Sequence, residues 1–63
     1  MATSTRDFRN EYIQEQIAHL EGEIERDNAS AKWYHENGCP FSARQVEARI
    51  DVNKRLIDTL RKM

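Results

Sequence analysis

A helix-breaking cluster, Asn37-Gly38-Cys39-Pro40, lies just past the middle of a chain that otherwise favours helix. Glycine just after a helix end, followed closely by proline, is a stop signal, because glycine adopts the left-handed conformation and proline cannot continue the helix. The flanking segments are rich in Glu, Arg, Ala, Gln, Ile and Leu, which favour helix. The sequence therefore predicts an all-α fold, an antiparallel hairpin of two helices.

The first predicted helix covers residues 5–37 and carries one apolar seam. Ser4, with Asp7 three residues later, resembles a capping box at its start. At 1.5 Å per residue this helix would be about 50 Å long, about ten residues longer than the second helix. Its seam follows the alternating steps of four and three that coiled coils use: Ile13, Ile17, Leu20, Ile24, Asp27, Ala31 and Tyr34.

The second predicted helix covers residues 42–62, after a loop at residues 38–41. Three signals agree on its start. Ser42 is a favourable N-cap, Gln45 completes a capping box with it, and Phe41 and Val46 are spaced as a hydrophobic staple. Its seam has the same kind of spacing as the first: Val46, Ile50, Asn53, Ile57 and Leu60.

Each seam contains one polar residue, Asp27 in the first helix and Asn53 in the second. A seam asparagine can fix the register and the oligomeric state of a bundle, at a cost in stability. Asn53 equally fits a solvated gap that faces Asp27. We therefore expect Asn53 either to specify an oligomer or to lie at this gap.

The 63 residues form a single domain that is too short to bury much surface alone. Small folds are usually reinforced by disulfides, a metal or oligomerisation. Cys39 is the only cysteine, which excludes an intramolecular disulfide and suits a reducing, cytoplasmic location. No apolar run has the length of a signal sequence or a membrane span. We therefore expect a cytoplasmic protein that forms a homodimeric bundle or binds a partner.

Charge is divided unevenly between the two predicted helices. Residues 1–37 hold eight acids and four bases, a net charge of −4, whereas residues 38–63 hold three acids and six bases, a net charge of +3. The whole chain has a net charge of −1, so it has no overall attraction to nucleic acid or membrane. An acidic helix beside a basic one favours antiparallel pairing, within the chain or across a dimer.

Six apolar residues lie outside the central seams, and we predict that they bind a partner protein: Phe8, Tyr12, Trp33, Val52, Leu56 and Met63. The three aromatic residues form a sparse stripe on the first helix, and Trp and Tyr are enriched at binding hot spots. The alternative is local packing, with Phe8 against Tyr12 and with Trp33 over the loop near Pro40 and Phe41. The other three widen the second helix's apolar face beyond what one neighbour covers. Alternatively, they are singly exposed residues.

The residues with catalytic or metal-binding chemistry do not form a recognisable site. His35 and Cys39 are four residues apart but straddle the predicted helix end, and His19 lies about four turns away, so a structural zinc site lacks its four ligands. No glycine-rich phosphate loop is present. Four carboxylates alternate around the first helix, and we expect them to be solvated: Glu21, Glu23, Glu25 and Asp27. We therefore predict no enzymatic activity, cofactor or metal.

These features predict a non-enzymatic interaction module that occupies a surface on a partner protein, as a small inhibitor, adaptor or assembly factor. Small proteins of this style are common among phage and mobile-element regulators of host machinery. One alternative is a structural subunit of a larger assembly. Another is a nucleic-acid-binding regulator that follows a phosphate backbone with the basic residues of its second helix: Arg44, Arg49, Lys54, Arg55, Arg61 and Lys62.

Overall fold

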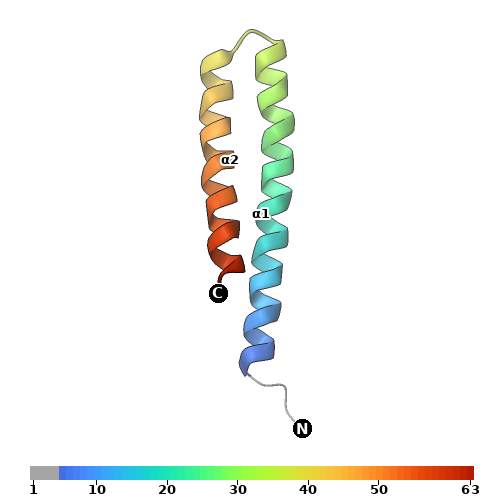
Figure 1. Ribbon diagram of the computed structural model, residues 1–63. Helices are drawn as coiled ribbons and strands as arrows, with labels where there is room; N and C mark the ends of the chain where they lie inside the picture. The colour runs from blue at the N-terminus through green and yellow to red at the C-terminus, as the bar shows by residue number, and fades with distance from the viewer. Residues whose placement is uncertain (1–4) are drawn as a thin grey trace.

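The computed structural model describes residues 5–63, with side chains from residue 8 onward, as two α-helices packed side by side. α1 spans Thr5–Glu36 and α2 spans Pro40–Arg61. The helices run antiparallel, a short loop joins them at one end, and the first turns of α1 extend past the end of α2 (Figure 1). The predicted all-α hairpin with a longer first helix is confirmed. Ser4, the predicted N-cap of the first helix, lies outside the described residues.

The loop ends α1 as the breaker cluster predicts. Gly38 has a φ of 73°, the left-handed conformation that favours glycine. The amide of Gly38 donates to the carbonyl of His35 at 3.4 Å, and the amide of Cys39 donates to the carbonyl of Tyr34 at 2.8 Å. These two hydrogen bonds form a Schellman motif with Gly38 at C′. The motif satisfies carbonyls that the last helical turn would otherwise leave without a partner.

α2 begins two residues earlier than predicted, at Pro40 rather than after an N-cap at Ser42. Cys39 precedes the helix, and its carbonyl accepts the first helical hydrogen bond from the amide of Ala43 at 3.1 Å. Proline suits the first helical position, because its φ is already helical and its missing N–H would have no partner there. The predicted capping box and staple at Ser42 are therefore wrong, and the Phe41 side chain is exposed.

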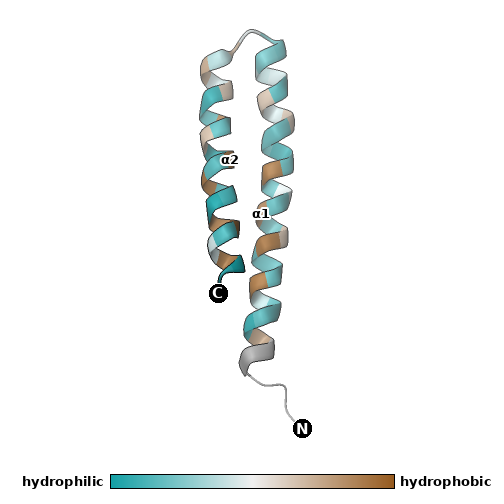
Figure 2. Cartoon of the chain, in the orientation of Figure 1, coloured by the Kyte–Doolittle hydropathy of each residue, from teal (hydrophilic) through white to brown (hydrophobic). Residues whose placement is uncertain are grey.

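The two predicted seams meet between the helices and form the core. Six apolar residues are buried there: Ile13, Ile17, Ala31, Ala43, Ile50 and Ile57. Three more are half-buried and pack against the isoleucines farthest from the loop: Leu20, Ile24 and Leu60. Figure 2 shows the strongest apolar colour in the half of the hairpin away from the loop. Sequence reasoning missed Ala43, which is fully buried near the loop, where a small side chain lets the helices approach each other closely.

The hairpin is a single layer and is strongly elongated. Its extents are 58 × 16 × 10 Å and its radius of gyration is 15.8 Å, whereas a compact globule of this length would have a radius of about 11 Å. The accessible surface is 5250 Å², which exceeds the value for a compact monomer of this mass by about 1,000 Å². Each helix therefore has one packed face, and its remaining faces are open.

Candidate functional site

The six apolar residues predicted to bind a partner are all exposed, with exposed fractions between 46% for Leu56 and 70% for Met63. They therefore lie outside the core between the helices. Phe41 joins them and is 73% exposed. Sequence reasoning missed Phe41 because it assigned this residue to a helix staple. The available signal was its spacing, because Phe41 precedes Val52 by three helical turns and lies on the same face of α2.

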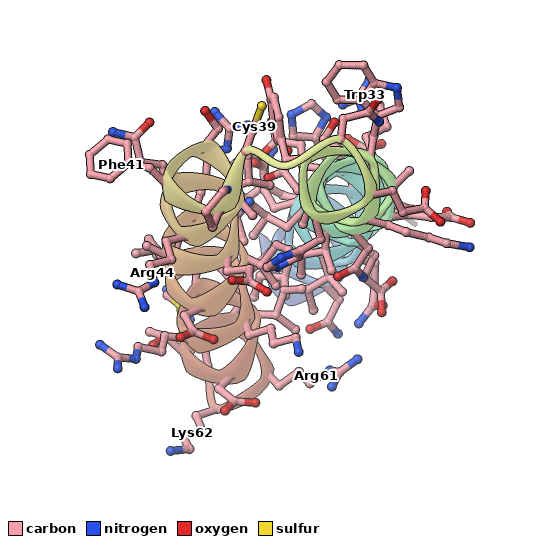
Figure 3. All side chains as sticks on the ribbon, turned by 90° about the horizontal axis from the view of Figure 1, so that it is seen from above. Trp33, Cys39, Phe41, Arg44, Arg61 and Lys62 are labelled. Atoms are coloured by element: carbon pink, nitrogen blue, oxygen red, sulfur yellow. The ribbon has the colours of Figure 1, made fainter. Side chains whose placement is uncertain are left out.

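Local packing leaves the aromatic residues of α1 largely exposed. The ring of Trp33 meets that of Tyr34 edge to face, with centroids 5.5 Å apart and an interplanar angle of 79°. Figure 3 places Trp33 over α1 and Phe41 on the far side of α2, so Trp33 does not cover Phe41. Phe8 and Tyr12 are each more than 60% exposed, and neither buries the other.

The exposed apolar residues of α2 form a stripe along the helix: Phe41, Val52 and Leu56. Met63, which follows the end of α2 at Arg61, is also exposed. At 100° per residue the residues of the stripe fall within an arc of about 60°, and this arc lies about 120° from the direction of the buried seam. Three exposed basic residues run beside the stripe within an arc of about 20°: Arg44, Arg55 and Lys62. Figure 3 shows Phe41 and Arg44 projecting from α2 on the side away from α1.

The exposed aromatic residues of α1 form a second, sparser stripe: Phe8, Tyr12 and Trp33. This stripe lies about 135° around the helix from the seam of α1. On each helix, viewed from its N-terminus, the stripe is reached from the seam by turning in the same direction. Because the two helices run in opposite directions and their seams face each other, turning in the same direction from each seam leads to the same side of the hairpin. We call this the apolar side. Three exposed acids border the stripe of α1: Glu11, Glu25 and Glu36.

The opposite side of the hairpin, which we call the polar side, carries no large apolar side chain among the described residues. Its positions on α1 and α2 are occupied by the following residues: Gln14, Glu21, Asn28, Lys32, Glu47, Lys54 and Asp58. The two sides therefore differ strongly in chemistry, although both are exposed. An elongated hairpin that only needed solubility would have no reason for this asymmetry.

Polar contacts join the helices in the half near the loop. Arg49 donates from Nε to Asp27 Oδ2 at 3.0 Å and from Nη2 to Asp27 Oδ1 at 2.9 Å, a two-pronged pairing that suits guanidinium and carboxylate. Asp27 is buried. The hydrogen bond from Arg49 lowers the pKa of Asp27, burial raises it, and the charges of Arg49 and Arg26 lower it, so that the net shift is downward.

Asn53 is buried in the seam of α2, as its position predicts, but it does not face Asp27. Its Nδ2 donates to Glu23 Oε2 at 3.2 Å, and Glu23 Oε1 lies 3.1 Å from Nε2 of His19. Asn53 and Asp27 therefore do not face each other, because each residue has a different partner. A role of Asn53 in specifying an oligomer remains a prediction.

The six basic residues of the alternative nucleic-acid surface divide into two groups. Arg49 holds Asp27, and Arg61 Nη2 lies 3.4 Å from Glu21 Oε2, so both contact α1. The other four are exposed: Arg44, Lys54, Arg55 and Lys62. The carboxylates of α1 were expected to be solvated. That expectation is wrong for Asp27, and Glu21 and Glu23 also make contacts with α2.

His35 and Cys39 have separate partners. Nε2 of His35 lies 3.3 Å from Oε2 of Glu47, and the Cys39 thiol donates to the carbonyl of Asn37 at 3.7 Å. Within residues 8–63, no three side chains of His, Cys, Asp or Glu are arranged to hold a metal ion. Over the same part of the chain, neither helix contains a stretch that is both long and apolar enough to cross a membrane.

No family model, curated protein or solved structure matches this chain. Functional inference therefore depends on the chain's own residues, and the asymmetry between the apolar side and the polar side is its most specific feature.

Proposed function

We propose that this chain is a non-enzymatic interaction module that acts as a small inhibitor, adaptor or assembly factor by placing its apolar side on another protein chain. The supporting observation is the exposure of seven large apolar side chains, which the helical repeat places toward this side: Phe8, Tyr12, Trp33, Phe41, Val52, Leu56 and Met63. Single exposed apolar residues are ordinary, but a gathered patch on a small protein is typical of an interaction surface.

The free energy of association requires that several residues of the apolar side are buried in the same interface. Complete burial of one large apolar side chain contributes about 1.5–3 kcal/mol. Association costs on the order of 4–15 kcal/mol in lost freedom before any affinity results. Several anchors must therefore be buried together. The hairpin holds them on two helices whose relative position is fixed by the seams, which lowers the ordering cost. Binding of this kind blocks or bridges a partner's surface without any chemical step.

The test is affinity capture with matched variants. The apolar-side variant combines Val52→Gln with Leu56→Gln, and the polar-side control combines Lys54→Gln with Asp58→Asn, which leaves the net charge unchanged. Circular dichroism first confirms that both remain helical. We expect a stoichiometric protein whose capture by the wild type survives nuclease and high salt. The apolar-side variant should lose at least tenfold in affinity, which is about 1.4 kcal/mol. Equal capture by both variants would contradict the proposal.

A second candidate, a nucleic-acid-binding regulator, is supported by the exposed row of Arg44, Arg55 and Lys62. Neutralising three phosphates gives a slope of about −2.7 in log affinity against log salt. The same capture assay separates the two functions. Nucleic-acid binding would vanish with nuclease, fall steeply with salt and depend on these three residues rather than on Val52 and Leu56.

A further inference from the structure

We infer that the chain that covers the apolar side is a second copy of this hairpin. In the two-fold dimer, α2 of one copy lies beside α1 of the other, and both loops lie at the same end. This inference rests on the proposed function, because it names the partner of the same apolar side.

The breadth of the apolar side favours a two-helix partner. A single helix covers one narrow stripe, whereas here each helix presents its own: α2 has Phe41, Val52 and Leu56, with Met63 just after its end, and α1 has Phe8, Tyr12 and Trp33. A second hairpin laid on this side makes a four-helix bundle in which both stripes gain a neighbour. The hairpin exposes about 1,000 Å² more than a compact monomer, and a standard interface buries about 800 Å² per partner.

Charge selects the second copy and its orientation. A two-fold interface brings one surface against itself, so the surface must be self-complementary. An axis parallel to the helices puts α2, whose segment of residues 38–63 has a net charge of +3, next to α1 of the other copy, whose segment of residues 1–37 has a net charge of −4. An axis across the helices instead pairs α1 with α1 and α2 with α2, which brings like charges together. Exposed ion pairs contribute little energy each, but they do select orientation.

The positions of the aromatic residues along the hairpin agree with this orientation. The contacts of Asp27 with Arg49 and of Glu23 with Asn53 fix which residues lie level across the hairpin. On this register Phe41 lies within two residues of the level of Trp33, near the loop. Met63, just after the end of α2, lies within one residue of the level of Tyr12 at the open end. An axis parallel to the helices keeps every residue at its own level. Phe41 and Met63 therefore each meet an aromatic residue from α1 of the second copy.

The native Cys39 gives a direct test, because it is the only cysteine and lies in the loop. Figure 3 shows Cys39 and Trp33 projecting to the same side of the hairpin. The experiment measures mass by analytical ultracentrifugation over a concentration series and then adds a short bis-maleimide. A monofunctional maleimide checks that the thiol is accessible, and Cys39→Ser provides the control without cross-linking.

We expect a mass of twice 7.5 kDa and efficient cross-linking through Cys39. Val52→Gln with Leu56→Gln should raise the dimer dissociation constant at least tenfold, whereas the polar-side control should leave it unchanged. A monomer at millimolar concentration overturns the inference. So does a dimer whose accessible thiols do not cross-link, because loops at opposite ends would be separated by about 33 Å, the length of α2.

The two proposals fail separately. A monomer whose capture of another protein still depends on Val52 and Leu56 overturns the second copy and leaves the proposed function standing. A different result would overturn both proposals. In that case the apolar-side variant still forms the cross-linked dimer and captures the same proteins as the wild type, because binding uses a different surface.

Discussion

The interface between α1 and α2 has two halves that differ in chemistry. Away from the loop, Ile13, Ile17 and Ile57 form an apolar cluster. Nearer the loop, the seam has one buried isoleucine, Ile50, and otherwise holds small and polar residues, among them Ala31, Ala43 and the pair of Asp27 and Arg49. The loop joins the helices covalently, so contacts next to it close short loops at little entropic cost. Contacts at the open end close the longest loops and depend on apolar burial.

The two halves therefore have different roles. Apolar side chains hold the open end together but tolerate small shifts, because apolar attraction is non-directional. The pairing of Asp27 with Arg49 has a fixed geometry, and a shift of one helix along the other would leave a buried carboxylate without its partner. We conclude that the apolar half supplies most of the stability and the polar half supplies the register.

The largest effect should come from the apolar half. Ile57→Ala removes buried atoms and leaves a cavity between the helices, at a cost of about 2–5 kcal/mol. Because a hairpin of this size is only marginally stable, we expect the variant to be largely unfolded at room temperature. Urea titration followed by circular dichroism measures this. Val52→Ala, at an exposed position of the same helix, should change the unfolding free energy by less than about 0.5 kcal/mol. Equal losses would mean that the core is not where the seams meet.

Arg49→Ala should have a smaller but clear effect, a fall of about 5 °C in the unfolding temperature. The reason is that it leaves the buried Asp27 carboxylate without its two hydrogen bonds. Replacing both residues by leucine removes the uncompensated charge and should restore most of the loss. Thermal unfolding of the single and double variants tests this. A double variant as unstable as the single one would contradict the account.

The lowered pKa of Asp27 predicts a dependence of stability on pH at the acid end. Its folded pKa lies below the unfolded value of about 3.9, so the unfolded chain takes up the proton first. The stabilisation is therefore complete above that value and is lost as the pH falls through the folded pKa. The unfolding temperature of the wild type should fall more steeply in this range than that of Asp27→Asn. Parallel curves would show that the carboxylate of Asp27 does not contribute.

Asn53→Leu should raise the unfolding temperature by a few degrees. The change buries apolar surface in the seam at about 25 cal/mol per Å², and Glu23, which loses one hydrogen bond, is exposed enough to be hydrated. The mass should become heterogeneous if Asn53 specifies the oligomer. Thermal unfolding and ultracentrifugation measure the two effects. An unchanged unfolding temperature would mean that the amide of Asn53 contributes as much as the leucine side chain.

Periodicity predicted much of the fold because burial in a helix pair follows the helical repeat. Asp27 and Asn53 are buried where the seam places them despite their polarity. Their partners were not predicted, because partners depend on how far one helix is shifted along the other, which no local pattern encodes. The same limit applies to the apolar side. The spacing of Val52 and Leu56 predicted an apolar face wider than one neighbouring helix covers, whereas the position of both stripes on one side follows only from the antiparallel pairing.

The smallest predicted effect concerns the start of α2, where local rules conflict. A serine N-cap replaced by alanine costs about 0.5–2 kcal/mol. Ser42 instead lies inside the helix that begins at Pro40, where alanine is favoured over serine by up to about 0.7 kcal/mol. Ser42→Ala should therefore raise the unfolding temperature slightly.

Pro40→Ala provides the matched comparison for the start of α2. It should lower the unfolding temperature, because proline at a compatible position restricts the unfolded chain by about 0.4–1 kcal/mol. Thermal unfolding of the two variants side by side tests this boundary. The result depends on whether each unfolding temperature rises or falls, and not on how large the change is. Opposite signs place the start at Pro40. A loss in Ser42→Ala alone would place it two residues later and restore the capping box. The sign is decisive because a helix that begins at Pro40 has Cys39 as its N-cap, so Ser42 cannot also be the N-cap.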